Sequence, residues 1–129
     1  MFKVNELLDR LCEALDAELV RQETILTICR KKQDAIRALD IEALEARTAA
    51  LECVLRETLE AEAERHHALR EAVDGLGLPE EGMILSRLIE AVSEPWKSRL
   101  LHFQRRLRET LEATQAVTRA YARDLRQYL

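Results

Sequence analysis

Apolar side chains recur along this chain in alternating steps of four and three residues, which is the spacing of one face of an α-helix. The pattern occupies three long segments. The 129 residues include only three glycines and two prolines, against 22 leucines and 17 alanines, which favour helix. Long amphipathic helices bury their apolar faces by packing on one another, so the sequence predicts an all-α fold.

The first apolar stripe covers residues 4–39 and changes phase near Asp40. The Asp40 carboxylate suits a helix N-cap, because it can accept from free N–H groups of the next turn. We therefore predict a tight hairpin at this point, and one long kinked helix is the alternative. Polar residues interrupt the stripe at three positions, Glu18, Gln22 and Lys32.

The second stripe covers residues 41–74 and stops where glycine and proline begin. Gly75 is expected to take the left-handed conformation that commonly ends a helix. Pro79 cannot continue a helix, because it lacks the N–H group and its ring clashes with the preceding turn. The sequence therefore predicts a clear break after the second helix.

A short helix at about 80–92 and a last long helix at about 94–128 are expected to follow, with Ser93 as the cap of the last one. The whole chain, 1–129, is then a single domain, an antiparallel bundle of three long helices with the short helix before the last. The last stripe consists of Trp96, Leu100, Phe103, Leu107, Thr110, Thr114, Val117, Tyr121, Leu125 and Tyr128.

Charge is distributed unevenly between the long segments. Residues 40–74 hold ten acids and four bases, whereas residues 94–129 hold eight bases and four acids. We therefore expect the second and last helices to attract each other along their flanks. The net charge of −4 for the whole chain gives no reason to expect a nucleic-acid partner.

Candidate chemistry is sparse. Glu64 and His67 form one Glu-x-x-His pair, but a di-iron bundle needs a second copy, and the residue three before His102 is Arg99. An enzyme with a cluster of cations is an alternative, for which Lys31-Lys32 and Arg105-Arg106 are the only doublets. We expect no catalytic activity, no metal and no cofactor.

Cysteine usage and the absence of long apolar runs favour a cytoplasmic protein. The three cysteines, Cys12, Cys29 and Cys53, are widely spaced and odd in number, which argues against a disulfide framework. No apolar run reaches the length of a signal or membrane segment, so we expect no membrane insertion.

The end of the last helix carries apolar residues with little chain left to cover them. These are Tyr121, Leu125, Tyr128 and Leu129. An uncovered apolar strip on a helix is suited to docking another amphipathic helix. Closure of a homodimer by the same strip is the alternative.

Five groups of residues follow one another in a characteristic order and spacing. They are Leu7-Leu8 with Leu11 and Leu15, then Asp40-Ile41-Glu42-Ala43-Leu44, Leu76-Gly77-Leu78-Pro79, Leu85-Ser86-Arg87-Leu88-Ile89, and Leu100-Leu101 with Leu107-Arg108 and Leu111. In this order the chain resembles, over nearly its whole length, the FlgN family of flagellar export chaperones. These are cytoplasmic helical proteins that hold hook-filament junction subunits before secretion.

The resemblance implies that the C-terminal half of the last helix receives an amphipathic helix from the terminus of a secreted hook-associated protein. In this chain the implied client-binding residues are Val117, Tyr121, Leu125 and Tyr128. At the positions of an Asn-x-x-Asn pair common in the family, this chain has Thr118 and Tyr121. Many family members also carry a Tyr-Gly tail implicated in docking to the export apparatus, whereas this chain ends Arg126-Gln127-Tyr128-Leu129, so the resemblance does not extend to that role.

Two other functions compete with this prediction. One is a self-associating structural coiled bundle without a client. The other is the related chaperone of the filament cap, which has a shorter first helix than residues 4–39 indicate.

Overall fold

The computed structural model describes residues 3–79 and 84–128, and in these residues it contains helices and no strand. The helices are α1 (Val4–Arg37), α2 (Ile41–Gly75), α3 (Leu85–Ala91) and α4 (Trp96–Tyr128). The prediction of an all-α chain is confirmed. Part of the short helix predicted at about 80–92 falls on residues 80–83, which lie outside the described residues. Leu129 also lies outside them.

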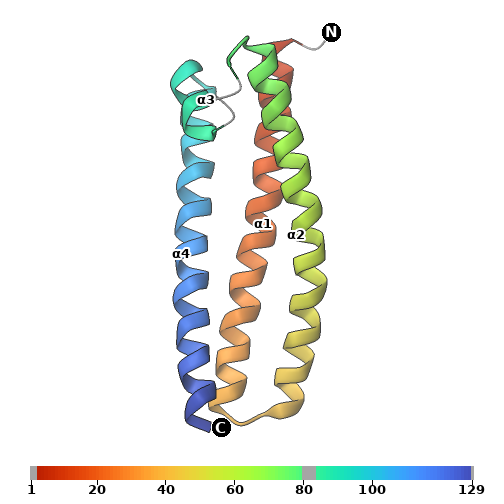
Figure 1. The fold of residues 1–129 in the computed structure, drawn as a ribbon, viewed down its shortest axis with the longest axis vertical. Helices are drawn as coiled ribbons and strands as arrows, with labels where there is room; N and C mark the ends of the chain where they lie inside the picture. Colours follow the sequence, from red (N-terminus) through yellow and green to blue (C-terminus); the bar gives the residue numbers. More distant parts are fainter. Residues whose placement is uncertain (1–2, 80–83, 129) are drawn as a thin grey trace.

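The three long helices lie along one another, and α1 lies between the other two (Figure 1). α1 and α4 run in the same direction, and α2 runs in the opposite one. α1 packs against both neighbours, whereas α2 and α4 scarcely touch within the described residues. The bundle is therefore open on the side where α2 and α4 would meet.

The prediction that the second and last helices attract each other along their flanks is wrong, because α2 and α4 scarcely touch within the described residues. Ion pairs between long helices of the described residues all involve α1, which carries both signs of charge and complements each neighbour. With α2 the pairs are Arg10–Glu71, Glu18–Arg65 and Arg21–Glu57, and with α4 they are Asp9–Arg99, Glu23–Arg106 and Arg37–Asp124. Exposed pairs each contribute only about 0.2–1 kcal/mol, so they align the helices more than they stabilise the fold.

The hairpin between α1 and α2 is formed without glycine, by Leu39 in the left-handed region at a φ of 53°. The N–H groups of Leu39 and Asp40 donate to the carbonyls of Ile36 and Ala35 at 3.1 and 2.9 Å, which is a Schellman motif. Asp40 then caps α2 as predicted, because its Oδ1 accepts from the Ala43 N–H at 3.0 Å.

The end of α2 has the same motif with glycine in the left-handed position. That residue is Gly77, at a φ of 68°, and not Gly75 as predicted. The N–H of Leu78 donates to the Val73 carbonyl at 3.0 Å. Gly75 remains helical, and a Cβ there would lie 2.5 Å from Cδ1 of Leu7, so its small size lets the end of α2 approach α1.

These two turns give a matched pair of stability predictions. Leu39→Gly should stabilise the protein by about 1 kcal/mol, because it removes the steric cost of a left-handed leucine. Gly77→Ala should destabilise it by about 1 kcal/mol for the same reason, since an added Cβ has open space around it and only the backbone conformation resists it. Urea denaturation measures both changes, and shifts of equal sign would contradict this account.

At the start of α4 the side-chain cap is Glu94, and not Ser93 as predicted. Oε2 of Glu94 accepts from the Ser98 N–H at 3.3 Å, and Oε1 accepts from the Ser98 hydroxyl at 2.8 Å. The predicted cap, Ser93, contributes its backbone carbonyl, which accepts from the Lys97 N–H at 3.2 Å.

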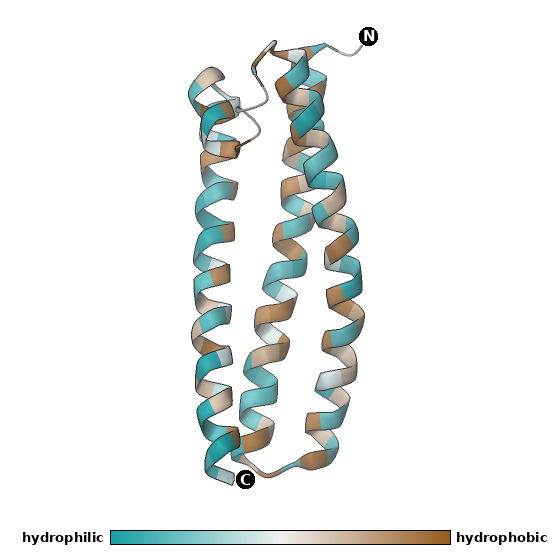
Figure 2. Cartoon of the chain, in the orientation of Figure 1, coloured by the Kyte–Doolittle hydropathy of each residue, from teal (hydrophilic) through white to brown (hydrophobic). Residues whose placement is uncertain are grey.

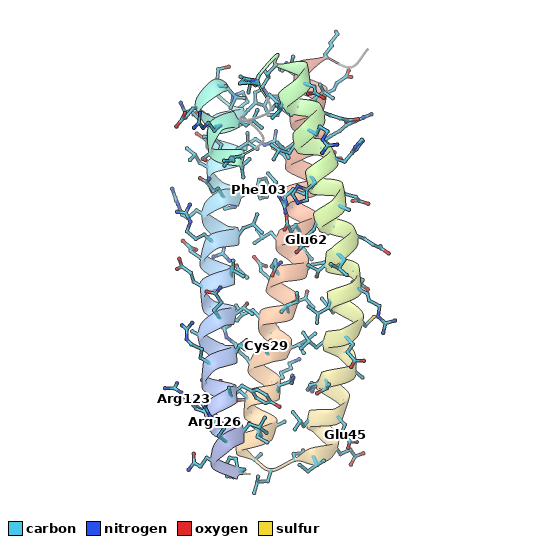
Figure 3. All side chains as sticks on the ribbon, in the orientation of Figure 1. Cys29, Glu45, Glu62, Phe103, Arg123 and Arg126 are labelled. Atoms are coloured by element: carbon cyan, nitrogen blue, oxygen red, sulfur yellow. The ribbon has the colours of Figure 1, made fainter. Side chains whose placement is uncertain are left out.

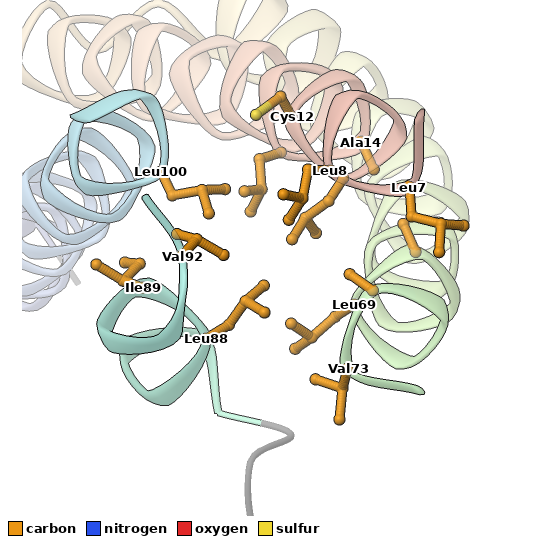
Figure 4. Close-up of a cluster of buried hydrophobic side chains, with 14 residues drawn as sticks. Leu7, Leu8, Cys12, Ala14, Leu69, Val73, Leu88, Ile89, Val92 and Leu100 are labelled. Atoms are coloured by element: carbon orange, nitrogen blue, oxygen red, sulfur yellow. The ribbon is translucent and has the colours of Figure 1, made fainter. Parts of the chain in front are cut away.

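The hydrophobic core lies at the end of the bundle that contains α3, which we call the α3 end. Leucines and valines from all four helices converge there (Figure 4). The largest fully buried side chains are Leu8, Leu11 and Leu15 of α1, Val73 of α2, Leu88 of α3 and Leu100 of α4, with Cys12 beside them. Trp96 and Phe103 pack against this cluster while remaining half-buried.

The opposite end, which we call the hairpin end, is packed less completely. Among the described residues, α2 has no buried side chain before Thr58, and α4 has none after Thr110. Apolar residues nevertheless continue along all three long helices to this end (Figure 2). None of the described helices has an apolar stretch long enough to span a bilayer. Apolar side chains of α2 and α4 therefore remain partly exposed at the hairpin end.

Candidate functional site

The four residues predicted to bind a client lie on one face of α4, in its last four turns. We call Val117, Tyr121, Leu125 and Tyr128 the C-terminal strip. Val117, Tyr121 and Leu125 are half-buried, and Tyr128 is 45% exposed. The fold brings these four side chains together and leaves each partly open to solvent.

Polar contacts with α1 fix the rotation of this end of α4. Oδ2 of Asp124 accepts from Nε of Arg37 at 2.9 Å and from Nε2 of Gln33 at 3.3 Å. Desolvation opposes ionisation of Asp124, but the hydrogen bonds from Gln33 and Arg37 prevail and lower the pKa of its carboxyl group. The ionised Asp124 holds the strip beside α1.

A groove of about 210 Å³ opens next to Tyr121, and we call it the hairpin-end groove. All three long helices contribute to it: Cys29 and Lys32 from α1, Leu51 from α2, and Thr118 and Tyr121 from α4 (Figure 3 labels Cys29). The Nζ of Lys32 lies 4.8 Å from the centroid of the Tyr121 ring, which is a cation–π contact. Tyr121 is thus held in place with part of its ring facing the groove.

A larger groove of about 380 Å³ lies between α2 and α4 nearer the core, and we call it the α3-end groove. Two of the residues that line it, Ile84 and Leu111, are 60% and 50% exposed. Its lining residues are Leu11, Leu15, Glu18 and Gln22 of α1, Arg65 and Leu69 of α2, Ile84 and Leu85 at the start of α3, and Gln104, Leu107 and Leu111 of α4.

Glu18 and Arg65 form an ion pair in the lining of the α3-end groove. Glu18 is only 7% exposed, and its Oε2 lies 2.6 Å from Nε of Arg65. The angles at this contact leave both atoms without a well-directed hydrogen bond. Burial raises the pKa of Glu18, against the opposing effect of the Arg65 charge. The groove therefore contains a nearly buried carboxylate that is paired with Arg65 through Oε2, while its Oε1 has no hydrogen-bond partner among the described residues.

The residues considered for metal binding or catalysis lie on the surface or have other partners. His67 lies on α2 with its Nε2 3.0 Å from Oε1 of Glu71, and Glu64 lies beside it at the same surface. Arg106 donates to Glu109 and Glu23 at 3.0 and 3.3 Å, so its charge is matched by carboxylates. The three cysteines are free thiols.

The sequence prediction omitted the residues of α1 and α2 that face the strip. These are Cys29, Lys32 and Leu51. A signal for α1 was present, because Glu18, Gln22 and Lys32 interrupt its apolar stripe and all three line a groove. In this chain the polar residues in the phase of the buried face of α1 therefore indicated where the grooves lie.

A protein-family model described as FlgN protein matches residues 1–129, the whole chain. No curated protein and no solved structure matches this chain.

Proposed function

Because the chain belongs to the FlgN family, a family of flagellar export chaperones, we propose a specific client for it. The client is the terminal amphipathic helix of a secreted hook-filament junction protein, which the chaperone binds in the cytoplasm and keeps unpolymerised. The C-terminal strip on α4 receives this helix.

The observation that carries this proposal is the partial exposure of the strip beside the hairpin-end groove. Three helices contribute to the groove, while Tyr121 and Tyr128 keep apolar surface in contact with water. An amphipathic client helix buries such surface without needing a deep pocket. The apolar area covered provides affinity at roughly 25 cal/mol per Å² before the cost of ordering the client is subtracted.

The same contact explains how a chaperone of this kind acts. An amphipathic terminal helix has one apolar face, and free subunits can associate through such a face. Covering that face in the cytoplasm removes the surface through which subunits would associate prematurely. Modest affinity is sufficient and useful, since the client must be released at export.

Self-association through the strip is the second candidate function. It is favoured by the same exposed apolar residues, which would be buried equally well in a homodimer. Light scattering over a dilution series separates the two: the chaperone proposal expects a monomer that forms a 1:1 complex with client, and the structural alternative expects a fixed oligomer without client.

The proposal is tested by alkylating the native thiols with iodoacetamide, with and without a peptide of the client's terminal helix. Cys29 lies in the hairpin-end groove, whereas Cys53 is exposed on α2. With peptide at ten times its Kd, alkylation of Cys29 should slow about tenfold, because only the unbound fraction reacts. Mass spectrometry of tryptic peptides measures each site.

Cys53 is the internal control, and its rate should not change with peptide. In the free protein Cys29 is expected to react more slowly than Cys53, because burial raises the pKa of the Cys29 thiol despite the nearby Lys32 charge. A bound peptide that leaves the Cys29 rate unchanged would argue against this site.

A further inference from the structure

The hairpin-end groove and the α3-end groove lie along the same faces of the long helices. On α1 the lining residues of both grooves follow one stripe, with Gln22 and Cys29 seven residues apart. On α4, Leu111 and Thr118 are likewise seven residues apart. Seven residues are close to two helical turns, so both grooves open on the same side of the bundle.

Thr58, Thr114 and Ile25 lie in the sequence between the residues that line the two grooves, and Thr58 and Ile25 are buried. The Thr58 hydroxyl donates to the Val54 carbonyl at 2.8 Å, and the Thr114 hydroxyl donates to the Thr110 carbonyl at 2.9 Å. Both hydroxyls are therefore satisfied within their own helices, which leaves their methyl groups for packing. On α1, the buried Ile25 lies between Gln22 and Cys29, which line the two grooves.

The length of the two grooves matches one helix. From Gln104 to Tyr121 along α4, where each lining residue keeps some exposure, the grooves together cover about 26 Å, at about 1.5 Å per residue. A client helix of about 17 residues would fill that length. A single added helix is therefore long enough to reach both grooves.

Glu18 indicates what chemistry that helix carries. Glu18 lines the α3-end groove with its Oε2 buried against Arg65, and its Oε1, which has no hydrogen-bond partner among the described residues, can accept another hydrogen bond. A purely apolar helix would seal this carboxylate from water and leave it unsatisfied, which is costly. A helix with one donor in its apolar face, such as an amide, hydroxyl or ammonium group, satisfies it instead.

We propose that the client helix extends beyond the C-terminal strip and lies along α1 between α2 and α4, with a hydrogen-bond donor of its apolar face opposite Glu18. This inference rests on the proposed function, since it assigns a longer binding surface to the same client. The amphipathic helix completes a four-helix bundle, whose core then includes Leu111 and Ile84.

The test compares Leu111→Glu with a matched control, Leu101→Glu, in calorimetric binding of a peptide of the client's terminal helix. Both leucines are exposed on α4, at 50% and 39%, but only Leu111 lines a groove. Leu111→Glu should weaken binding at least about tenfold, because the new carboxylate would be buried under the peptide. Leu101→Glu should bind as the native protein does, and circular dichroism verifies that both variants fold.

Glu18→Gln tests the donor. It keeps the size of the side chain but removes the charge that strengthens the hydrogen bond, so binding should weaken about three- to tenfold. Unchanged binding by Leu111→Glu would overturn the extended site, and unchanged binding by Glu18→Gln would overturn the assigned donor.

The outcomes separate this inference from the function on which it rests. Loss of binding only in variants of the C-terminal strip keeps the proposed function and rejects the longer site. A native protein that binds no peptide rejects both. A dimer of the free protein that Leu111→Glu dissociates assigns the groove to a second copy and also overturns the inference.

Discussion

Replacing Tyr121 and Leu125 together with aspartate is expected to abolish client binding while the chain remains folded. Both side chains are half-buried on the C-terminal strip, and Tyr121 also lines the hairpin-end groove. A docked client helix would enclose the two new carboxylates in an apolar contact, at a cost of about 1–3 kcal/mol each. Affinity should therefore fall by about 100-fold or more.

The fold should survive this change because the core is at the other end of the molecule. No side chain of α4 after Thr110 is buried in the described residues, so the substitutions create no buried charge in the free protein. Pull-down of the secreted subunit from an extract of flagellated cells and circular dichroism give the two readouts. A double variant of two exposed leucines that line neither groove, Leu59→Asp with Leu101→Asp, is the matched control.

Two results would contradict the assignment of the strip. A client that still binds the Tyr121→Asp, Leu125→Asp variant must contact another surface. If the Leu59→Asp, Leu101→Asp control loses client binding equally, negative charge anywhere on the bundle prevents binding. The result would then not assign the client to the strip.

The helices could be predicted from the sequence because their boundaries depend on local chemistry. Asp40 has the side chain of an N-cap, and it is one. Leu39 could not be recognised as the residue that ends α1, since a left-handed leucine is uncommon and only its hydrogen-bonding context stabilises it. Gly75 and Gly77 were both plausible helix ends, and the left-handed φ of Gly77 with the hydrogen bond from Leu78 to Val73 distinguishes them.

The arrangement of the helices was harder to predict because net charge per segment does not specify which faces meet. The second and last helices have opposite charge, yet α1 carries acids and bases on both flanks and pairs with each of them. The apolar stripe of the last helix predicted only that Val117, Tyr121, Leu125 and Tyr128 share one face of α4. The partners of this face on α1 and α2, such as Lys32 and Leu51, depend on how far the helices separate, which periodicity does not encode.

Removing the positive partner of Glu18 should destabilise the protein in a pH-dependent way. Arg65→Met leaves the 7%-exposed Glu18 without its counter-charge, and breaking a buried pair in this way costs about 3–5 kcal/mol at neutral pH. Burial already raises the pKa of Glu18 above the ordinary 4.5, with Arg65 opposing the rise, so the substitution should raise it further. Urea denaturation at pH 7.5 and pH 5 measures the effect.

The sign of the pH dependence follows from the raised pKa. The folded protein keeps a proton on Glu18 at pH values where the unfolded chain has lost it, so folding is disfavoured increasingly as pH rises above 4.5. The gap in unfolding free energy between native protein and Arg65→Met should therefore narrow from pH 7.5 to pH 5. Arg21→Met is the control: Arg21 and Glu57 are 3.7 Å apart with exposed side chains, so its cost should be about 0.5 kcal/mol and should not narrow in this way.

The double variant Glu18→Leu, Arg65→Met tests whether the Glu18–Arg65 ion pair serves folding stability or client recognition. If the pair only fills space, an apolar replacement of similar volume should restore or exceed native stability, because it removes the desolvation cost of both charges. The same variant should bind client peptide more weakly than the native protein, since the acceptor opposite the client's donor is gone. Gain of stability together with loss of affinity means that the buried charges serve recognition, whereas a double variant as unstable as Arg65→Met would mean that they serve the fold.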